Sequence, residues 1–406
     1  MRKMNRKQLE QNKRKLENEK EKIEYIAQMR KFANMLGGEG TFALFPQQLI
    51  ENSYQLRILP LKMVVNNRVE ISEKDHRRFW KSMKNLLKMK QHYFKFNDME
   101  IDTEWFICSG LNIVNLVDYS IQYRAEEPWS IELSKRIAPD IKKELFEKSY
   151  VALYDVASFL YFWLYRFDDS QFWFNFELKK LPEDSKHLQN VVEVNAEAVE
   201  PRYFTIGTNK RPAYKIGWPQ TQTGIDYIEI SPSLFGREFD GQVSVPVYIQ
   251  SHALNRMEER LDSLNLQELI SSVYASLLKP VAVRKEKCRI LLSYRILETK
   301  MGYFTAQYID GAVLIHTFLF ITNNGTPEGQ KLNELTGLGK LDKKYLTIDK
   351  LSTFINSDIS TNEKLKDLFI KAGCNSLLEI DEAVKAIAKK QQEMAISDLI
   401  LKYIEK

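Results

Sequence analysis

The hydrophobic pattern changes along the chain and divides it into segments of different predicted structure. Residues 1–35 lack Pro and Gly and are rich in Lys, Glu and Gln, which predicts a helix ending at Gly37-Gly38. The aromatic-rich residues 140–180 predict a buried helix followed by a strand. Short apolar runs between turn-forming residues over 191–230 predict a β-rich region, and the chain from Leu341 predicts helices. The expected fold class is α+β.

Residues 243–322 predict a small unit of two helices and an antiparallel sheet. A strand from Val243 to Gln250 leads into an amphipathic helix that begins at Ser251. A second helix has Leu and Ile at helical spacing and ends before Pro280. The strands expected after it are Cys288–Leu297, Tyr303–Ile309 and Ala312–Thr322.

The last two of these strands form the clearest predicted hairpin. Asp310-Gly311 between apolar runs is typical of a two-residue type I′ turn. That turn fixes the register of the hairpin, so it pairs Ile309 with Ala312 and therefore Thr305 with His316. Side chains alternate between the faces of a strand, so His316 and Thr305 are expected on a face that is less apolar than the other.

Four segments are expected from these patterns. They are a basic helical arm (1–40), an α+β domain of unknown role (41–240), the two-helix and antiparallel-sheet domain (241–325) and a helical tail (326–406).

The helix that begins at Ser251 carries the residues most suited to chemistry. His252, Arg256 and Arg260 fall on one side of it, and the opposite side is apolar. If Ser251 caps the helix, His252 lies in its first turn, where free backbone N–H groups attract a phosphate. Surface ion pairs with Glu259 are the alternative interpretation of these arginines.

The family resemblance given in the next paragraph implies RNA as the substrate, and cleavage of RNA through the 2′-hydroxyl needs a base, an acid and fixed positive charge on the phosphate. We predict His252 as the base and His316 as the acid, with Arg256 beside them. Arginine suits the third role because its planar fork binds two phosphate oxygens. The candidates for phosphate binding are Arg260, Arg289 and Arg295.

The order Ser-His-Ala-x-x-Arg-x-x-Glu-Arg, followed by a second helix and an antiparallel sheet, resembles the ribonuclease toxin superfamily of RelE, colicin D, barnase and EndoU. The resemblance covers about residues 245–325. It implies RNA cleavage without a metal or other cofactor, and a phage or mobile-element setting. The motif carries over only His252, Arg256 and Arg260; His316 and the strand arginines are assigned from geometry.

Net charge, cysteine spacing and the length of apolar runs limit the class of protein and its location. The chain of 406 residues has a net charge of +5, and residues 1–31, with eleven basic and five acidic residues, account for +6. Three widely spaced cysteines predict neither a disulfide framework nor a zinc site. The longest apolar run, Val156–Tyr165, is about half the ~20 residues that a membrane-spanning helix needs. A cytoplasmic protein that does not enter a membrane is expected.

The predicted function is therefore that of an endoribonuclease. The alternative is a cytoplasmic protein that binds nucleic acid or protein through a degenerate, non-catalytic version of the same fold. RNA is the expected partner in the first case. A protein partner could bind through the N-terminal arm or the C-terminal helix.

Overall fold

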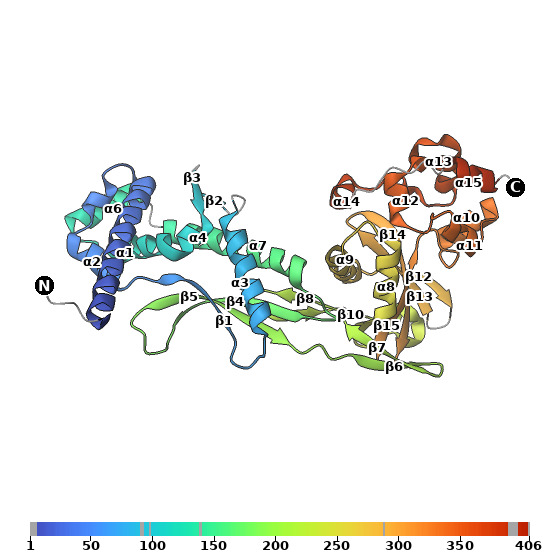
Figure 1. Cartoon of the computed structure of the whole chain (residues 1–406), viewed down its shortest axis with the longest axis horizontal. Coiled ribbons are helices and arrows are strands. Elements are labelled where there is room, and N and C mark those ends of the chain that lie inside the picture. The colour runs from blue at the N-terminus through green and yellow to red at the C-terminus, as the bar shows by residue number, and fades with distance from the viewer. Residues whose placement is uncertain are drawn as a thin grey trace. The chain divides into compact units, whose positions relative to one another are not determined.

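The computed structural model describes residues 6–89, 93–96, 99–137, 140–286, 289–388 and 397–404, and it has an α+β fold. The chain divides into two compact units (Figure 1). Unit 1 comprises Met1–Tyr161, Trp173–Ala196 and Thr221–Thr223, and unit 2 comprises Phe162–Phe172, Glu197–Gln220 and Gly224–Lys406. Within the described residues, no helix is both long and apolar enough to cross a membrane.

Unit 1 contains most of the N-terminal helices and a small sheet. Its helices are α1 (Arg6–Gly37), α2 (Gln47–Gln55), α3 (Glu73–Lys88), α4 (Thr103–Trp105), α5 (Leu111–Tyr123), α6 (Pro128–Arg136) and most of α7 (Ile141–Leu164). Its strands are β1 (Leu59–Val65), β2 (Tyr93–Phe96), β3 (Met99–Asp102), most of β4 (Gln171–Lys180) and most of β5 (Leu188–Glu197). The main sheet has the order β1-β5-β4, and β1 runs parallel to β5.

The N-terminal helix is only partly the solvated arm that its composition predicts. Residues 10–20 of α1 are exposed, as expected. Tyr25, Met29 and Phe32, in contrast, are buried in the core of unit 1. The expected arm is therefore wrong for the second half of α1, because its apolar residues contact α5 and α6 through that core.

The aromatic segment forms the predicted helix and strand, as α7 and β4, but the helix is not buried throughout, because Tyr150, Phe159 and Trp163 are exposed. Tyr161 of α7 stacks on Phe174 of β4 with ring centroids 5.5 Å apart, and its hydroxyl accepts a hydrogen bond from the Phe174 backbone N–H at 2.9 Å. Both residues are buried. These contacts fix the helix to the strand within unit 1.

Unit 2 contains a large sheet, two helices that pack against it and a set of short C-terminal helices. Its strands are β6 (Arg202–Ile206), β7 (Asn209–Lys215), β8 (Gly217–Gln220), β9 (Gly224–Tyr227), β10 (Glu229–Ile230), β11 (Val245–Gln250), β12 (Ala282–Glu286), β13 (Arg289–Ile296), β14 (Thr299–Ile309) and β15 (Ala312–Phe320). Its helices are α8 (Ser251–Arg260), α9 (Leu266–Leu278), α10 (Pro327–Thr336), α11 (Lys340–Tyr345), α12 (Leu351–Asn356), α13 (Glu363–Lys371), α14 (Glu382–Ile387) and α15 (Ser397–Ile404).

The large sheet has the strand order β12-β13-β14-β15-β11-β7-β6, and β10 pairs with β11 beside that path. β11 is parallel to β15 and antiparallel to β7. α8 contacts β15, and α9 contacts β13. The domain boundary expected after residue 240 is not a boundary between the two units, because β6 and β7 belong to the same sheet as the later strands.

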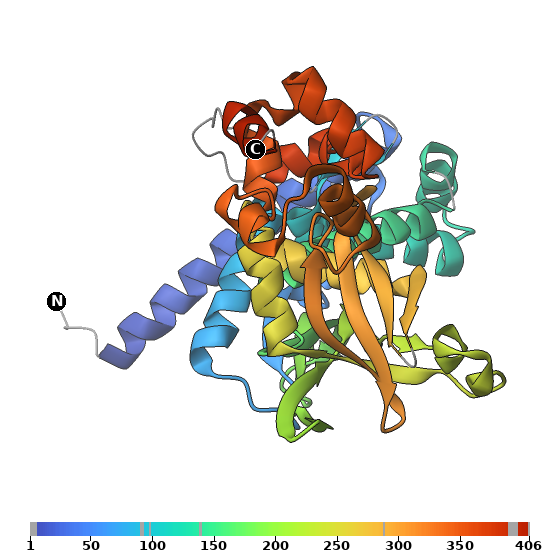
Figure 2. The ribbon, with the colours of Figure 1, turned by 90° about the vertical axis from the view of Figure 1, so that its right-hand side faces the viewer.

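Strands β14 and β15 form a hairpin (Figure 2). It begins with the predicted turn and then departs from the predicted ladder. Asp310 and Gly311 both have positive φ, at 50° and 68°, as a type I′ turn requires. Ile309 pairs with Ala312 as expected. Beyond that, a β-bulge leaves His316 without a partner and shifts Thr305 to Thr317, so the predicted Thr305–His316 pair is wrong.

Two glycines of this hairpin offer a test of its geometry. A Cβ added at Gly302 would meet the Leu319 carbonyl oxygen, whereas one at Gly311 would meet nothing within 4 Å. We expect Gly302→Ala to lower the free energy of unfolding by about 3 kcal/mol, because the strands cannot keep their spacing. Gly311→Ala should cost about 1 kcal/mol through its positive φ. Urea unfolding of the two variants measures the difference, and equal losses would contradict the described strand spacing.

Candidate functional site

Unit 2 has a cavity of about 430 Å³ at its sheet, which we call the two-histidine cavity. Strands β6, β7, β11, β13, β14 and β15 and the start of α8 contribute to its wall. The residues that line it are Ile206, Arg211, Gln250, His252, Arg289, Ile290, Leu291, Thr305, Ala306, His316 and Thr317.

The sequence-predicted site residues divide into two groups. His252, His316 and Arg289 line the two-histidine cavity together. The other three predicted residues, Arg256, Arg260 and Arg295, are not among its lining residues. The structure thus brings together both histidines and one of the four arginines.

His316 lies in the bulge of β15 and is half-buried in the cavity wall. Its Nε2 is buried and has no hydrogen-bond partner among the described residues. Burial, together with the positive charges of Arg289 and Arg211, lowers the pKa of His316 from 6.5 to about 4. The imidazole is therefore neutral at neutral pH, and its Nε2 makes no hydrogen bond to the described residues.

His252 occupies the first turn of α8 and is exposed at the cavity. The N-cap of this helix is Gln250, with extended backbone angles, so the expected cap at Ser251 is wrong by one residue. No side chain caps the helix. The first backbone N–H groups of a helix have no partner inside the helix, and they attract anions.

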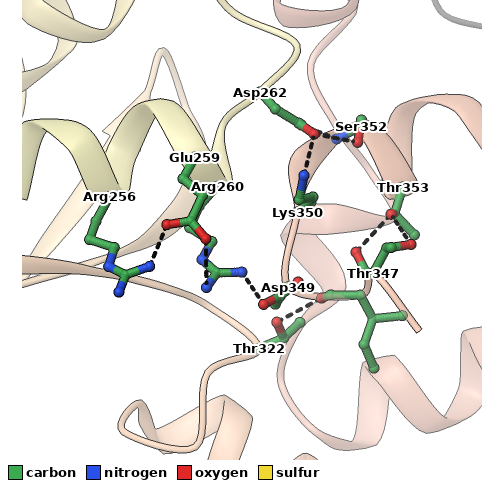
Figure 3. A network of polar contacts seen from close by, with 11 residues as sticks. Arg256, Glu259, Arg260, Asp262, Thr322, Thr347, Asp349, Lys350, Ser352 and Thr353 are labelled. Carbon is green, nitrogen blue, oxygen red and sulfur yellow. Dashed lines mark hydrogen bonds and ion pairs between the residues drawn. The ribbon is translucent and has the colours of Figure 1, made fainter. Parts of the chain in front are cut away.

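Arg256 and Arg260 take part in ion pairs on the far part of α8 (Figure 3). Arg256 pairs with Glu259, whose carboxylate also lies 3.4 Å from Nη2 of Arg260. Arg260 pairs with Asp349, and these two side chains are only 12% and 10% exposed. The alternative that the sequence left open for these arginines, ion pairs with Glu259, describes their contacts in the structure.

The same polar network attaches the chain after the sheet to the end of α8 (Figure 3). Asp262 accepts hydrogen bonds from the backbone N–H and the hydroxyl of Ser352, at 3.0 and 2.8 Å. Lys350 lies 3.5 Å from the same carboxylate. Thr322 is buried, and its hydroxyl donates to the Ile348 carbonyl at 2.8 Å. The C-terminal segment is therefore packed on the domain rather than free.

Arg295 lies on β13, as Arg289 does, but its guanidinium has a different environment. Its Nη1 donates to the Glu298 carbonyl at 3.0 Å, and its backbone N–H donates to the Ser276 hydroxyl at 3.0 Å. The side chain is exposed. A bulge between Tyr294 and Arg295 interrupts the β13–β14 ladder, so the alternation of side chains does not continue unbroken from Arg289 to Arg295.

Several lining residues were not predicted from the sequence, and two of them, Arg211 and Gln250, bear on the chemistry of the cavity. Arg211 comes from β7, and Gln250 is the last residue of β11. Their positions follow from the pairing of β7 with β11, in which Gln250 lies opposite Ala213. The sequence around Arg211 contains no pattern from which the pairing of β7 with β11 could be predicted. The clustering of Arg211 with His316 depends on long-range sheet topology.

Comparison with known proteins gives no match: no protein-family model, curated protein or solved structure corresponds to the chain. The resemblance of the α8 segment to ribonuclease toxins therefore stays a prediction. Function must be argued from the geometry of the cavity.

The two arginines of α8 are a matched pair for testing the polar network. Arg260→Gln leaves Asp349 buried without its charge partner, so we expect a loss of about 3 kcal/mol in the free energy of unfolding. Arg256, whose side chain is 42% exposed, should lose less than about 1 kcal/mol on the same change. Chemical denaturation of both variants gives the comparison, and a larger loss at Arg256 would refute this ranking.

The depressed pKa of His316 predicts how stability depends on pH. Between pH 4 and 6.5 the unfolded chain protonates this imidazole while the folded protein does not. Stability is thus lost as the pH falls through that window. We expect His316→Asn to make this loss shallower, and His252→Asn to serve as the exposed control. The measurement is the unfolding midpoint of each protein at several pH values across this window. If the midpoint of both variants falls with pH as steeply as that of the parent, the lowered pKa of His316 is disproved.

Proposed function

We propose that the two-histidine cavity binds a phosphodiester of RNA and cleaves it by attack of the adjacent 2′-hydroxyl. One observation carries the proposal: His252 and His316, from different elements, line one cavity together with Arg211 and Arg289. Two proton-transfer groups and two fixed cations are the components that this reaction requires.

The environments of the histidines suggest which one acts as the base. His316 is neutral, and its Nε2 lacks a partner among the described residues. It suits removal of the 2′-hydroxyl proton, while His252, exposed at the helix start, suits protonation of the leaving 5′-oxygen. This assignment reverses the roles expected from the sequence. The products are a 2′,3′-cyclic phosphate and a 5′-hydroxyl. His316 gains the proton of the 2′-hydroxyl, and His252 gives up the proton that the 5′-oxygen receives.

The arginines would act on both the substrate and the base. Arg211 and Arg289 lower the proton affinity of His316 in the free protein. A bound phosphate offsets their positive charge and raises the pKa of His316 toward the range in which a base is effective. The same guanidiniums can bind the non-bridging oxygens as negative charge develops on them.

The cavity chemistry also favours a mechanism without a metal. None of the lining residues that the structure describes carries a carboxylate. Divalent cations such as Mg²⁺ are usually held in proteins by carboxylate oxygens. In the proposed reaction the guanidiniums supply the positive charge instead.

A second candidate function is RNA binding without cleavage. It is favoured by the positions of Arg256 and Arg260, which carry the family-like motif but pair with Glu259 and Asp349 outside the cavity wall. In that case the cavity would hold a phosphate and no bond would break. Product analysis distinguishes the two functions.

The test uses the full chain and a set of short RNAs labelled at the 5′ end, with EDTA present. We expect fragments that end in a cyclic phosphate. His316→Ala and His252→Ala should each lower kcat/KM by about 10²-fold or more, because each removes one proton transfer. Arg289→Gln should lower it as well.

Arg295→Gln is the matched control, since Arg295 lies on the same strand outside the cavity wall. It should leave kcat/KM unchanged. Cleavage that persists in the double histidine variant would place the activity elsewhere. Binding without cleavage at any pH would select the second candidate function.

A further inference from the structure

Gln250 is a buried amide at the cavity whose donor is unsatisfied. It is 2% exposed, lines the two-histidine cavity and ends β11 directly before α8. Its Nε2 is buried and has no hydrogen-bond partner among the described residues. A buried N–H group without a partner is unfavourable and unusual. A bound ligand with a hydrogen-bond acceptor would remove this cost.

Gln250 is also an unusual residue for its place in the helix. N-cap positions favour Ser, Thr, Asp and Asn, whose short side chains accept hydrogen bonds from the first turn. Gln250 makes no such bond, and α8, with ten residues, starts without a side-chain cap. The side chain of Gln250 therefore accepts no hydrogen bond from the backbone N–H groups of the first turn. Its own Nε2 also has no acceptor among the described residues.

Three side chains of the cavity wall and the start of α8 offer hydrogen-bond donors. Arg211 and Arg289 have only donors on their guanidiniums, and the free group of Gln250 is its NH₂. A helix start adds backbone N–H groups and a positive dipole end. These donors fit a ligand that accepts hydrogen bonds from all of them, and the phosphodiester group of a nucleic acid is such a ligand. Base edges mostly combine donors with acceptors, so they fit this set less well.

We infer that the two-histidine cavity holds a phosphate subsite in which Gln250 Nε2 donates to a non-bridging oxygen, with Arg211 and Arg289 supplying the charge. The ligand is the backbone phosphate of the RNA, and in this respect the inference rests on the proposed function. Gln250 touches the substrate and orients the phosphate between the histidines. Phosphate binding itself requires no cleavage.

The first experiment titrates inorganic phosphate into the full chain by calorimetry. Gln250→Leu keeps a similar volume and removes the donor, and we expect the dissociation constant to rise about 10- to 100-fold, the range for a hydrogen bond to a charged group. Gln250→Glu should weaken binding at least as much, because it adds a negative charge. Arg295→Gln should bind as the parent does. Unchanged affinity in a folded Gln250→Leu protein would overturn the inference.

A measurement on the unaltered protein covers the case in which a variant does not fold. The side-chain amide signals of Gln250, followed by ¹H–¹⁵N NMR, should move during the phosphate titration and saturate with the calorimetric dissociation constant. Signals that stay in place while phosphate binds would show that the anion lies elsewhere, and would overturn the inference.

Competition then identifies the source of the phosphate. An RNA with a 2′-deoxy sugar at the reactive position cannot be cleaved but keeps the backbone phosphate. Its displacement of inorganic phosphate supports the RNA backbone as the ligand; failure to displace it would refute that source. Binding that depends on Gln250 in a protein that cleaves no RNA would retain the subsite and reject the proposed cleavage.

Discussion

The position of β11 between β7 and β15 is the constraint on which the candidate site depends. Its antiparallel pairing with β7 places Gln250 opposite Ala213, two residues from Arg211. Its parallel pairing with β15 aligns Ile249 with Ile315, the neighbour of His316. The chain then enters α8 without a loop, which puts His252 two residues after the strand. One strand thus fixes the places of groups that come from three other elements.

The sequence predicted features that depend on local chemistry. The Asp310-Gly311 turn was found because type I′ turns need residues that tolerate positive φ, and α8 because apolar and charged residues alternate at helical spacing. The bulge at His316 and the pairing of β7 with β11 depend on contacts across the sheet. Neither leaves a pattern in nearby residues, so the ladder and Arg211 were missed.

Arg256 and Arg260 show why a motif alone cannot assign a role to a cation. Both occupy the helix side that bears His252, but a helix side extends along its axis as well as around it. His252 is at the N-terminal end, beside the cavity, whereas Arg260 is at the other end and pairs with Asp349. Burial of that pair makes it a contact between α8 and the C-terminal segment, whose removal leaves an uncompensated charge.

The large sheet of unit 2 contains strands that precede residues 231–244 in the chain, β6 and β7, and strands that follow them, β11 to β15. Arg211 is encoded well before residues 245–325, but it lines the same cavity as His252 and His316. Recombination that joined a new upstream sequence near codon 240 would transfer both histidines without one of their two cations. Such a breakpoint would separate residues that line one cavity, so an intact cavity wall requires that both gene segments are inherited together.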